Sequence, residues 1–308
     1  MNRSAIGMIV GGLLNAALVL LAAPFFQGVL RKLTARIQSR QGPPLLQPYF
    51  DLLKLLGKED IESGEVPRMQ QFAVYLSLAT ALVVSCFVPM GFAAPMDRAG
   101  DVIVLIYLLT LSGNCTLLVG LASGSTYSLV GASREMMSMI ALEPLFVIAI
   151  VVGSVHTQSF RLDTVLHGSV YVTDAFPWSG LIMIVVILLS FQAFVQRAPF
   201  DISEAETELM EGPLMEYSGP KLALLKCASM AKLVIYSALF VGIFDPWGSG
   251  LAFPLGWLIF WLKVFGLVIL VTVVAATHAR YRIDQAIRYF ASLLVMALAA
   301  LGLATYGY

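Results

Sequence analysis

The strongest constraint in this chain is a series of apolar runs, most of them long enough to cross a membrane. A transmembrane helix needs about 20 mostly apolar residues. Eight stretches approach or meet this length, at residues 6–30, 72–92, 102–122, 139–155, 180–195, 222–243, 254–277 and 286–306. The runs are continuous and do not alternate with a period of two, so they predict helices and not the strands of a barrel.

Composition points to the same fold class. Of the 308 residues, 59% are hydrophobic and only 12% are charged, whereas a soluble domain averages about 25% charged. A chain with so little charge cannot cover itself with a polar surface, so lipid must be its solvent. We therefore expect an all-α polytopic protein in which residues 1–308 form one integral membrane domain. The net charge of +0 gives no indication of nucleic acid binding.

The distribution of Lys and Arg predicts the orientation. Fourteen of them lie on the odd-numbered connections or their flanks, against Arg3, Arg98 and Arg161 on the other side. Cytoplasmic loops carry the excess of Lys and Arg. This predicts a prokaryotic cytoplasmic (inner) membrane protein with both termini outside. The first apolar run is too long for a signal-peptide core, so we expect it to be retained as a span.

The first connection, residues 31–68, contains a Gly-Pro-Pro turn at 42–44 followed by a leucine-rich segment. The turn cannot lie inside a helix. Beyond it the leucines alternate with Asp51, Lys54 and Lys58, which predicts an amphipathic helix along the membrane surface. Two interpretations stay open: a docking surface for a peripheral partner, or a solvated loop that only sets the topology.

A second segment, residues 120–144, begins with small and polar residues and runs into the fourth apolar run. Arg134 and Glu135 are expected to begin a helix there. Glu143 follows eight residues after Glu135, about 12 Å further along at 1.5 Å per residue. It is therefore expected within the hydrocarbon. An ionisable side chain at such depth is costly and is a functional candidate by default.

A third segment, residues 196–221, concentrates acidic side chains between Arg197 and Lys221. Its carboxylates are Asp201, Glu204, Glu206, Glu208, Glu211 and Glu216. The spacing i, i+3, i+7, i+10 of four of them predicts one stripe of an α-helix, begun by a capping box. If shielded from water, such a row holds protons near neutral pH and serves as a proton relay. The alternative is an acidic loop that only docks a basic partner.

Two lysines fall inside apolar runs, Lys232 in the sixth and Lys263 in the seventh. Each is interpreted either as a snorkelling side chain or as the positive partner of a buried carboxylate. A structural ion pair between Glu143 and one of these lysines, or Arg134, is the alternative to a functional Glu143. No catalytic triad, phosphate loop or metal-ligand spacing occurs. The cysteines and histidines show no such pattern: Cys86, Cys115, Cys227, His156, His167 and His278.

Taken together, three segments closely resemble the eight-span membrane subunit shared by respiratory complex I and the group 4 membrane-bound [NiFe] hydrogenases. They are GPPLLQPYFDLLKLLGKE, residues 120–144 and APFDISEAETELMEGPLMEYSG. The phrases GASREMM and EGPLMEYSG resemble the hydrogenase branch, which includes formate-hydrogenlyase, CO-linked and energy-converting enzymes. Complex I subunits tend to carry a Glu where this chain has Phe194, between neutral Gln192 and Gln196. This departure disfavours a quinone chamber.

The resemblance implies a subunit that anchors a hydrophilic catalytic arm and couples its electron transfer to the movement of protons or sodium. Its partners would be hydrogenase large and small subunits, iron–sulfur subunits and antiporter-like membrane subunits. The [NiFe] centre and [4Fe-4S] clusters would belong to those partners, with no cofactor and no catalytic centre in this chain. A quinone-chamber subunit of a complex I-like dehydrogenase, a passive membrane anchor and an independent transporter are the alternatives.

Candidate residues follow from the motifs, the lysines and the resemblance. The expected ion path comprises Glu143, Asp201, Glu204, Glu206, Glu208, Glu211, Glu216, Lys232 and Lys263. The expected interface and coupling residues are Arg36, Arg40, Asp51, Lys54, Arg134, Glu135 and Arg197.

Overall fold

The chain is a multi-pass, all-helical membrane protein. The computed structural model describes residues 5–61, 66–97, 100–166, 176–245, 247–248, 251 and 253–307. Within these ranges the regular elements are helices, apart from one isolated bridge. Seven helices are long and apolar enough to span a membrane: α1 (Ala5–Ile37), α3 (Pro67–Phe87), α4 (Val102–Ser123), α5 (Thr126–Thr157), α9 (Gly219–Phe244), α10 (Leu255–Thr277) and α11 (Ile283–Thr305).

An eighth apolar helix, α7 (Trp178–Phe194), has 17 residues. At 1.5 Å per residue it is roughly 26 Å long, slightly less than the ~30 Å thickness of a hydrocarbon core. Four short elements lie between the long helices: α2 (Gln47–Leu56), α6 (Leu162–Val165), α8 (Glu206–Leu209) and the 3-10 turn η2 (Gly212–Leu214).

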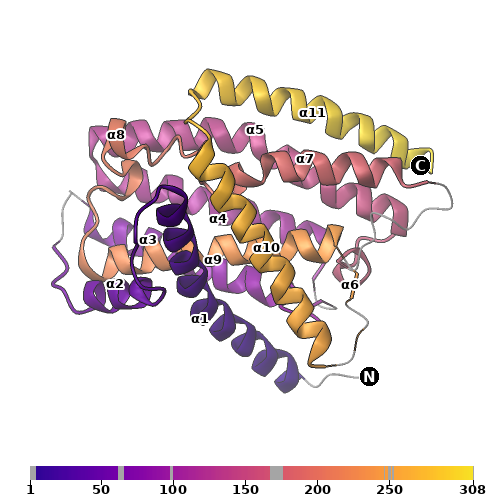
Figure 1. Ribbon diagram of the computed structural model, residues 1–308, viewed down its shortest axis with the longest axis horizontal. Helices are drawn as coiled ribbons and strands as arrows, with labels where there is room; N and C mark the ends of the chain where they lie inside the picture. Colours follow the sequence, from indigo (N-terminus) through magenta and orange to yellow (C-terminus); the bar gives the residue numbers. More distant parts are fainter. Residues whose placement is uncertain are drawn as a thin grey trace.

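The long helices form two groups that meet at α5. Helix α3 packs on α4 and α9, while α5 packs on α4, α7 and α11. Helices α1 and α10 lie against each other and against α9. Figure 1 shows α2 and α8 at one end of the molecule and both termini toward the other. Helix α9 is the most enclosed span, with 78% of its apolar window buried, so its polar residues meet protein and not lipid.

Two helix boundaries differ from the apolar runs for identifiable reasons. Helix α5 begins at Thr126, well before Arg134, because its first turns are buried against protein through Ser128 and Gly131. Helix α3 ends at Phe87, whereas the apolar run continues to residue 92. The residues beyond it include a proline and Gly91 with φ of +82°, and neither continues a helix.

The predicted amphipathic helix is confirmed as α2. It follows the Gly-Pro-Pro turn and exposes the apolar side chains of Phe50 and Leu53. On its other side the Arg31 guanidinium lies 2.6 Å from the Asp51 carboxylate. This contact, the largest cause, holds the pKa of Asp51 below its ordinary value. An exposed apolar side beside a paired polar side suits a helix lying in the membrane surface.

Candidate functional site

The acidic segment between α7 and α9 is a folded loop, and the predicted helical stripe is wrong. Only Glu206–Leu209 form a helical turn. The next two residues have φ of +53° and +82°, and Gly212 follows with φ of +53°. A Cβ on Gly212 would lie 2.1 Å from the Ser203 carbonyl oxygen. The loop therefore folds back on itself at a glycine, and this closure prevents a continuous helix.

This loop is wedged between helix ends. A Cβ on Gly131 of α5 would lie 2.9 Å from the Pro213 ring and 3.0 Å from the Ser203 carbonyl oxygen. The connection between α10 and α11 holds the other side, where Arg280 donates a 2.9 Å hydrogen bond to Asp201. Close contact on both sides gives the loop a buried face and an exposed face.

On the exposed face, two carboxylates pair with surface cations. Glu208 is 63% exposed and lies 2.8 Å from the Arg134 guanidinium, whose hydrogen bond and charge hold the pKa of Glu208 below its ordinary value. Glu211 lies 3.9 Å from the ammonium of Lys226. Exposed pairs of this kind contribute little to stability, about 0–1 kcal/mol.

Two further carboxylates are partly buried. Asp201 is 18% exposed and accepts the Arg280 hydrogen bond, and Glu216 precedes α9. The side chain of Glu206 lies outside the described part of the structure. The six acids predicted as one group therefore occupy different environments.

Glu204 occupies the buried face of the loop. It lines a cavity of about 30 Å³ together with Ser203, Glu135, Gln196 and Lys232. Burial, and then the charge of Asp201, raise the pKa of Glu204 to about 7, although the Arg197 guanidinium opposes the shift. Glu204 can therefore gain and lose a proton near neutral pH, as a relay group must.

A buried polar junction lies beside this cavity. Gln196 donates a short hydrogen bond to the carboxylate of Glu135, which is 6% exposed. The Lys232 ammonium donates a 3.0 Å hydrogen bond to the Ser112 carbonyl of α4, and Lys232 is 9% exposed. We call these three side chains, Glu135, Gln196 and Lys232, the junction.

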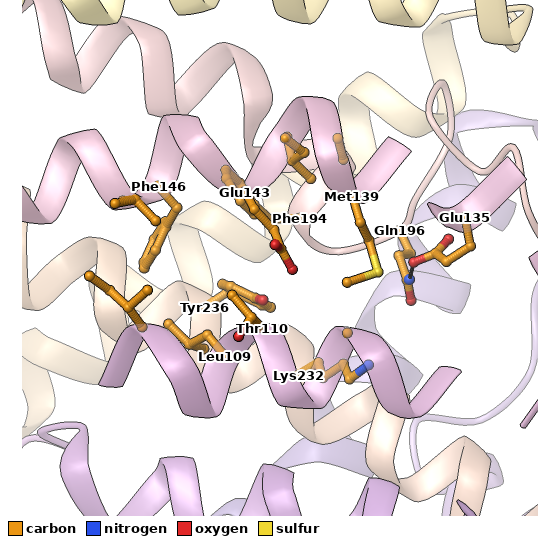
Figure 2. Close-up of a pocket in the computed structure, with 15 residues that line it drawn as sticks. Leu109, Thr110, Glu135, Met139, Glu143, Phe146, Phe194, Gln196, Lys232 and Tyr236 are labelled. Carbon is orange, nitrogen blue, oxygen red and sulfur yellow. Dashed lines mark hydrogen bonds between the residues drawn. The ribbon is translucent and has the colours of Figure 1, made fainter. Parts of the chain in front are cut away.

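A second cavity, of about 60 Å³, lies on the other side of the junction and contains Glu143. Glu143 lies 17 residues into α5, roughly 26 Å from its start at 1.5 Å per residue. Figure 2 shows its carboxylate on the opposite side of the cavity from Tyr236 and Thr110. The rings of Phe146 and Phe194, 5.3 Å apart, form part of the wall.

All three junction residues line both cavities. Figure 2 shows Lys232 across the cavity from Glu135 and Gln196. Each water needs about 10–15 Å³ of such volume and a few polar partners, so the two cavities have room for about two and about four waters. The arrangement therefore provides alternating side chains and water sites from Glu204 to Glu143, which is the composition of a proton relay.

The cations proposed as ion-pair partners of Glu143 bind elsewhere. Lys232 donates to Ser112, and Arg134 pairs with Glu208. Lys263 lies 2.7 Å from the Asp245 carboxylate, beyond the C-terminal end of α9, whereas the acidic loop precedes the N-terminal end.

The expected interface residues are divided between the surface and the interior. Arg36, Arg40 and Lys54 lie near α2 at the surface. Arg197 is partly buried and donates a 2.6 Å hydrogen bond to Gln27, and burial lowers the pKa of its guanidinium.

Sequence analysis missed Tyr236 and treated Gln196 only as a neutral replacement. Tyr236 lies one helical turn after Lys232, so the i, i+4 spacing was an available signal. Gln196 reaches Glu135 from a distant segment, and no local pattern indicates that contact. Among the described residues, no group of three or more His, Cys, Asp and Glu side chains is placed to hold a metal ion.

A bundle of apolar helices enclosing a row of carboxylates defines a polytopic membrane protein with the machinery of an ion path. Residues 10–305 match the NADH dehydrogenase family, and the chain belongs to that family.

Individual relatives span two kinds of complex. The chain is 36% identical to formate hydrogenlyase subunit 4 of Escherichia coli (strain K12) over 88% of its length and 91% of that protein. It is 30% identical to an NADH-quinone oxidoreductase subunit of Syntrophotalea carbinolica, over 94% and 90%. A solved structure of a membrane-bound sulfane sulfur reductase, an archaeal respiratory membrane complex, superposes with a TM-score of 0.86 at 25% identity, covering 97% of this chain and 99% of that one.

Proposed function

We propose that this chain is the membrane-anchor and ion-translocating coupling subunit of a membrane-bound [NiFe] hydrogenase complex. The observation that carries the proposal is the row from Glu204 through the junction to Glu143, which joins the acidic loop to the centre of the bundle. The 36% identity to formate hydrogenlyase subunit 4 supports the type of complex.

The coupling works through charge. Electron transfer in a peripheral partner changes the electrostatic potential at the loop, or moves the loop, and so alters the affinity of Glu204 for a proton. Moving one charge against 100 mV costs about 2.3 kcal/mol, and a pKa change of about two units supplies that energy. Because the pKa of Glu204 is already about 7, a shift in either direction changes its protonation at neutral pH.

The orientation and the partners complete the proposal. The end bearing α2 and the acidic loop faces the cytoplasm, and both termini lie outside the inner membrane, since the Lys and Arg excess lies on the former side. Hydrogenase large and small subunits and iron–sulfur subunits dock at this end, where Arg36, Arg40 and Lys54 lie at the surface. These partners hold the [NiFe] centre and [4Fe-4S] clusters, and antiporter-like subunits lie beside the bundle.

The Glu204→Gln substitution tests the proposal in the assembled complex reconstituted in vesicles. Gln keeps the shape but cannot exchange a proton, so hydrogen evolution should remain measurable while ion translocation falls about tenfold or more. A passive anchor would show altered assembly with unchanged ions moved per hydrogen formed, and that ratio would contradict the proposal. Glu208→Gln is the matched control, because Glu208 lies on the exposed face of the same loop.

The second candidate is a quinone-chamber subunit of a complex I-like dehydrogenase. An apolar groove of about 1110 Å³ lies between α1 and α10, lined by Leu18, Phe26 and Phe265. Further along the same two helices lies a polar cavity of about 460 Å³, lined by Arg31 and Arg197 among others. Such a pair of spaces suits an amphiphile with a polar head. Hydrogen evolution that responds to an added quinone analogue would favour this candidate, and an unchanged rate would disfavour it.

A further inference from the structure

The junction places a fixed positive charge inside the path. Lys232 projects from the most enclosed span, α9, and lines both cavities. Its ammonium is held by the Ser112 carbonyl of α4, 3.0 Å away. Across the cavity lies the carboxylate of Glu135, which accepts a hydrogen bond from Gln196. Any ion moving between Glu204 and Glu143 must pass this ammonium.

Oxygen ligands are too few here for a metal cation. A hard cation that leaves water needs a shell of oxygen atoms in its place. The larger cavity is mostly apolar, and its side-chain oxygens come from Glu143, Thr110, Tyr236 and the two junction residues Glu135 and Gln196. One oxygen of Glu135 is already occupied by the Gln196 hydrogen bond.

Space and charge act in the same direction. The smaller cavity, about 30 Å³, holds about two waters, fewer than a hydrated metal cation carries. The ammonium already neutralises negative charge at the junction, so a second cation there meets like-charge repulsion in a low-dielectric interior. A proton avoids both problems, because it moves by exchange along hydrogen bonds and needs no ligand shell.

We propose that Lys232 is the selectivity element of the path, a positioning residue whose ammonium excludes sodium ions and leaves a route for protons alone. This inference rests on the proposed coupling function and assigns its ion.

The first experiment uses the unaltered complex in vesicles, with hydrogen evolution, a pH-sensitive dye and radioactive sodium uptake followed together. In sodium-free and sodium-rich buffer alike, the proton translocation per hydrogen formed should be the same, with no coupled sodium uptake into vesicles that contain this subunit and its hydrophilic arm. Coupled sodium uptake would overturn the inference and leave the coupling function intact. Absence of any translocated ion would instead overturn the coupling function itself.

The second experiment compares Lys232→Gln with Lys263→Gln. Gln at 232 removes the positive charge, so proton translocation should fall about tenfold, and sodium should inhibit what remains by occupying the vacated position between carboxylates. Lys263→Gln should keep wild-type coupling and insensitivity to sodium, because Lys263 binds Asp245 at the far end of α9. A Lys232→Gln complex with full, sodium-insensitive proton translocation contradicts the inference; if that variant does not assemble, the sodium test on the unaltered complex decides.

Discussion

Glu204 and Glu208 stand four residues apart in one loop and have opposite electrostatic environments. Burial and the neighbouring Asp201 raise the pKa of Glu204 to about 7, whereas the exposed Glu208 is paired with Arg134 and its pKa is lowered. Sequence analysis identified both as candidates, since an acidic cluster is visible in the chain. It could not separate them, because burial of one carboxylate and exposure of the other follow from the fold of the loop.

A pH-dependent stability difference follows from the raised pKa of Glu204. The folded state favours its neutral form, so the favourable contribution is present below about pH 4.5 and is lost as the pH rises to about 7. The Glu204→Gln variant has no such loss. We expect it to match the wild-type melting temperature at pH 5 and to exceed it at pH 8, by an amount equivalent to about 2 kcal/mol.

Thermal unfolding of the purified complex in detergent at the two pH values measures this difference. Glu208→Gln serves as the control and should give no gain at pH 8, because Arg134 stabilises the ionised carboxylate that the substitution removes. Equal melting temperatures for wild type and Glu204→Gln at pH 8 would show that Glu204 is hydrated.

Helix α5 and the acidic loop are in direct contact, and this contact transmits any movement of the loop to the path. A Cβ on Gly131 would meet the Pro213 ring at 2.9 Å and two backbone atoms at 3.0 and 3.1 Å. Sequence analysis expected small residues here to allow close backbone approach but took the loop for a helix. The i, i+3 spacing of the acids was misleading, since the closure at Gly212 depends on the distant Ser203 carbonyl.

Substitution of Gly131 by Ala should therefore displace the loop. We expect a destabilisation of about 1–3 kcal/mol from overpacking and a lower ratio of ions moved to hydrogen formed. Gly266→Ala is the matched control, because nothing lies within 4 Å of a Cβ at that position, and Ala is favoured over Gly in a helix by about 0.5–1 kcal/mol. If both variants couple equally well, the loop contact has no role in coupling.

At the level of the whole molecule, the apolar runs predicted the helices well because lipid imposes long, uninterrupted hydrophobic segments. Each of the eight runs overlaps a long helix of the structure. The position of Glu143 midway along α5 was also accessible, since helical rise converts sequence distance into depth. The junction was not accessible, because it joins α5, α9 and a residue just after α7, and only the packing of distant segments brings them together.

The most direct measurement is proton translocation per hydrogen formed by the Glu143→Gln complex in sealed vesicles. Glu143 is the end of the row inside the membrane and is far from any partner that docks at the acidic loop, so its loss should leave assembly and hydrogen evolution measurable. The expected result is hydrogen evolution with translocation abolished. Translocation at the wild-type ratio would show that ions do not pass through Glu143, and the chain would then serve only to anchor its partners.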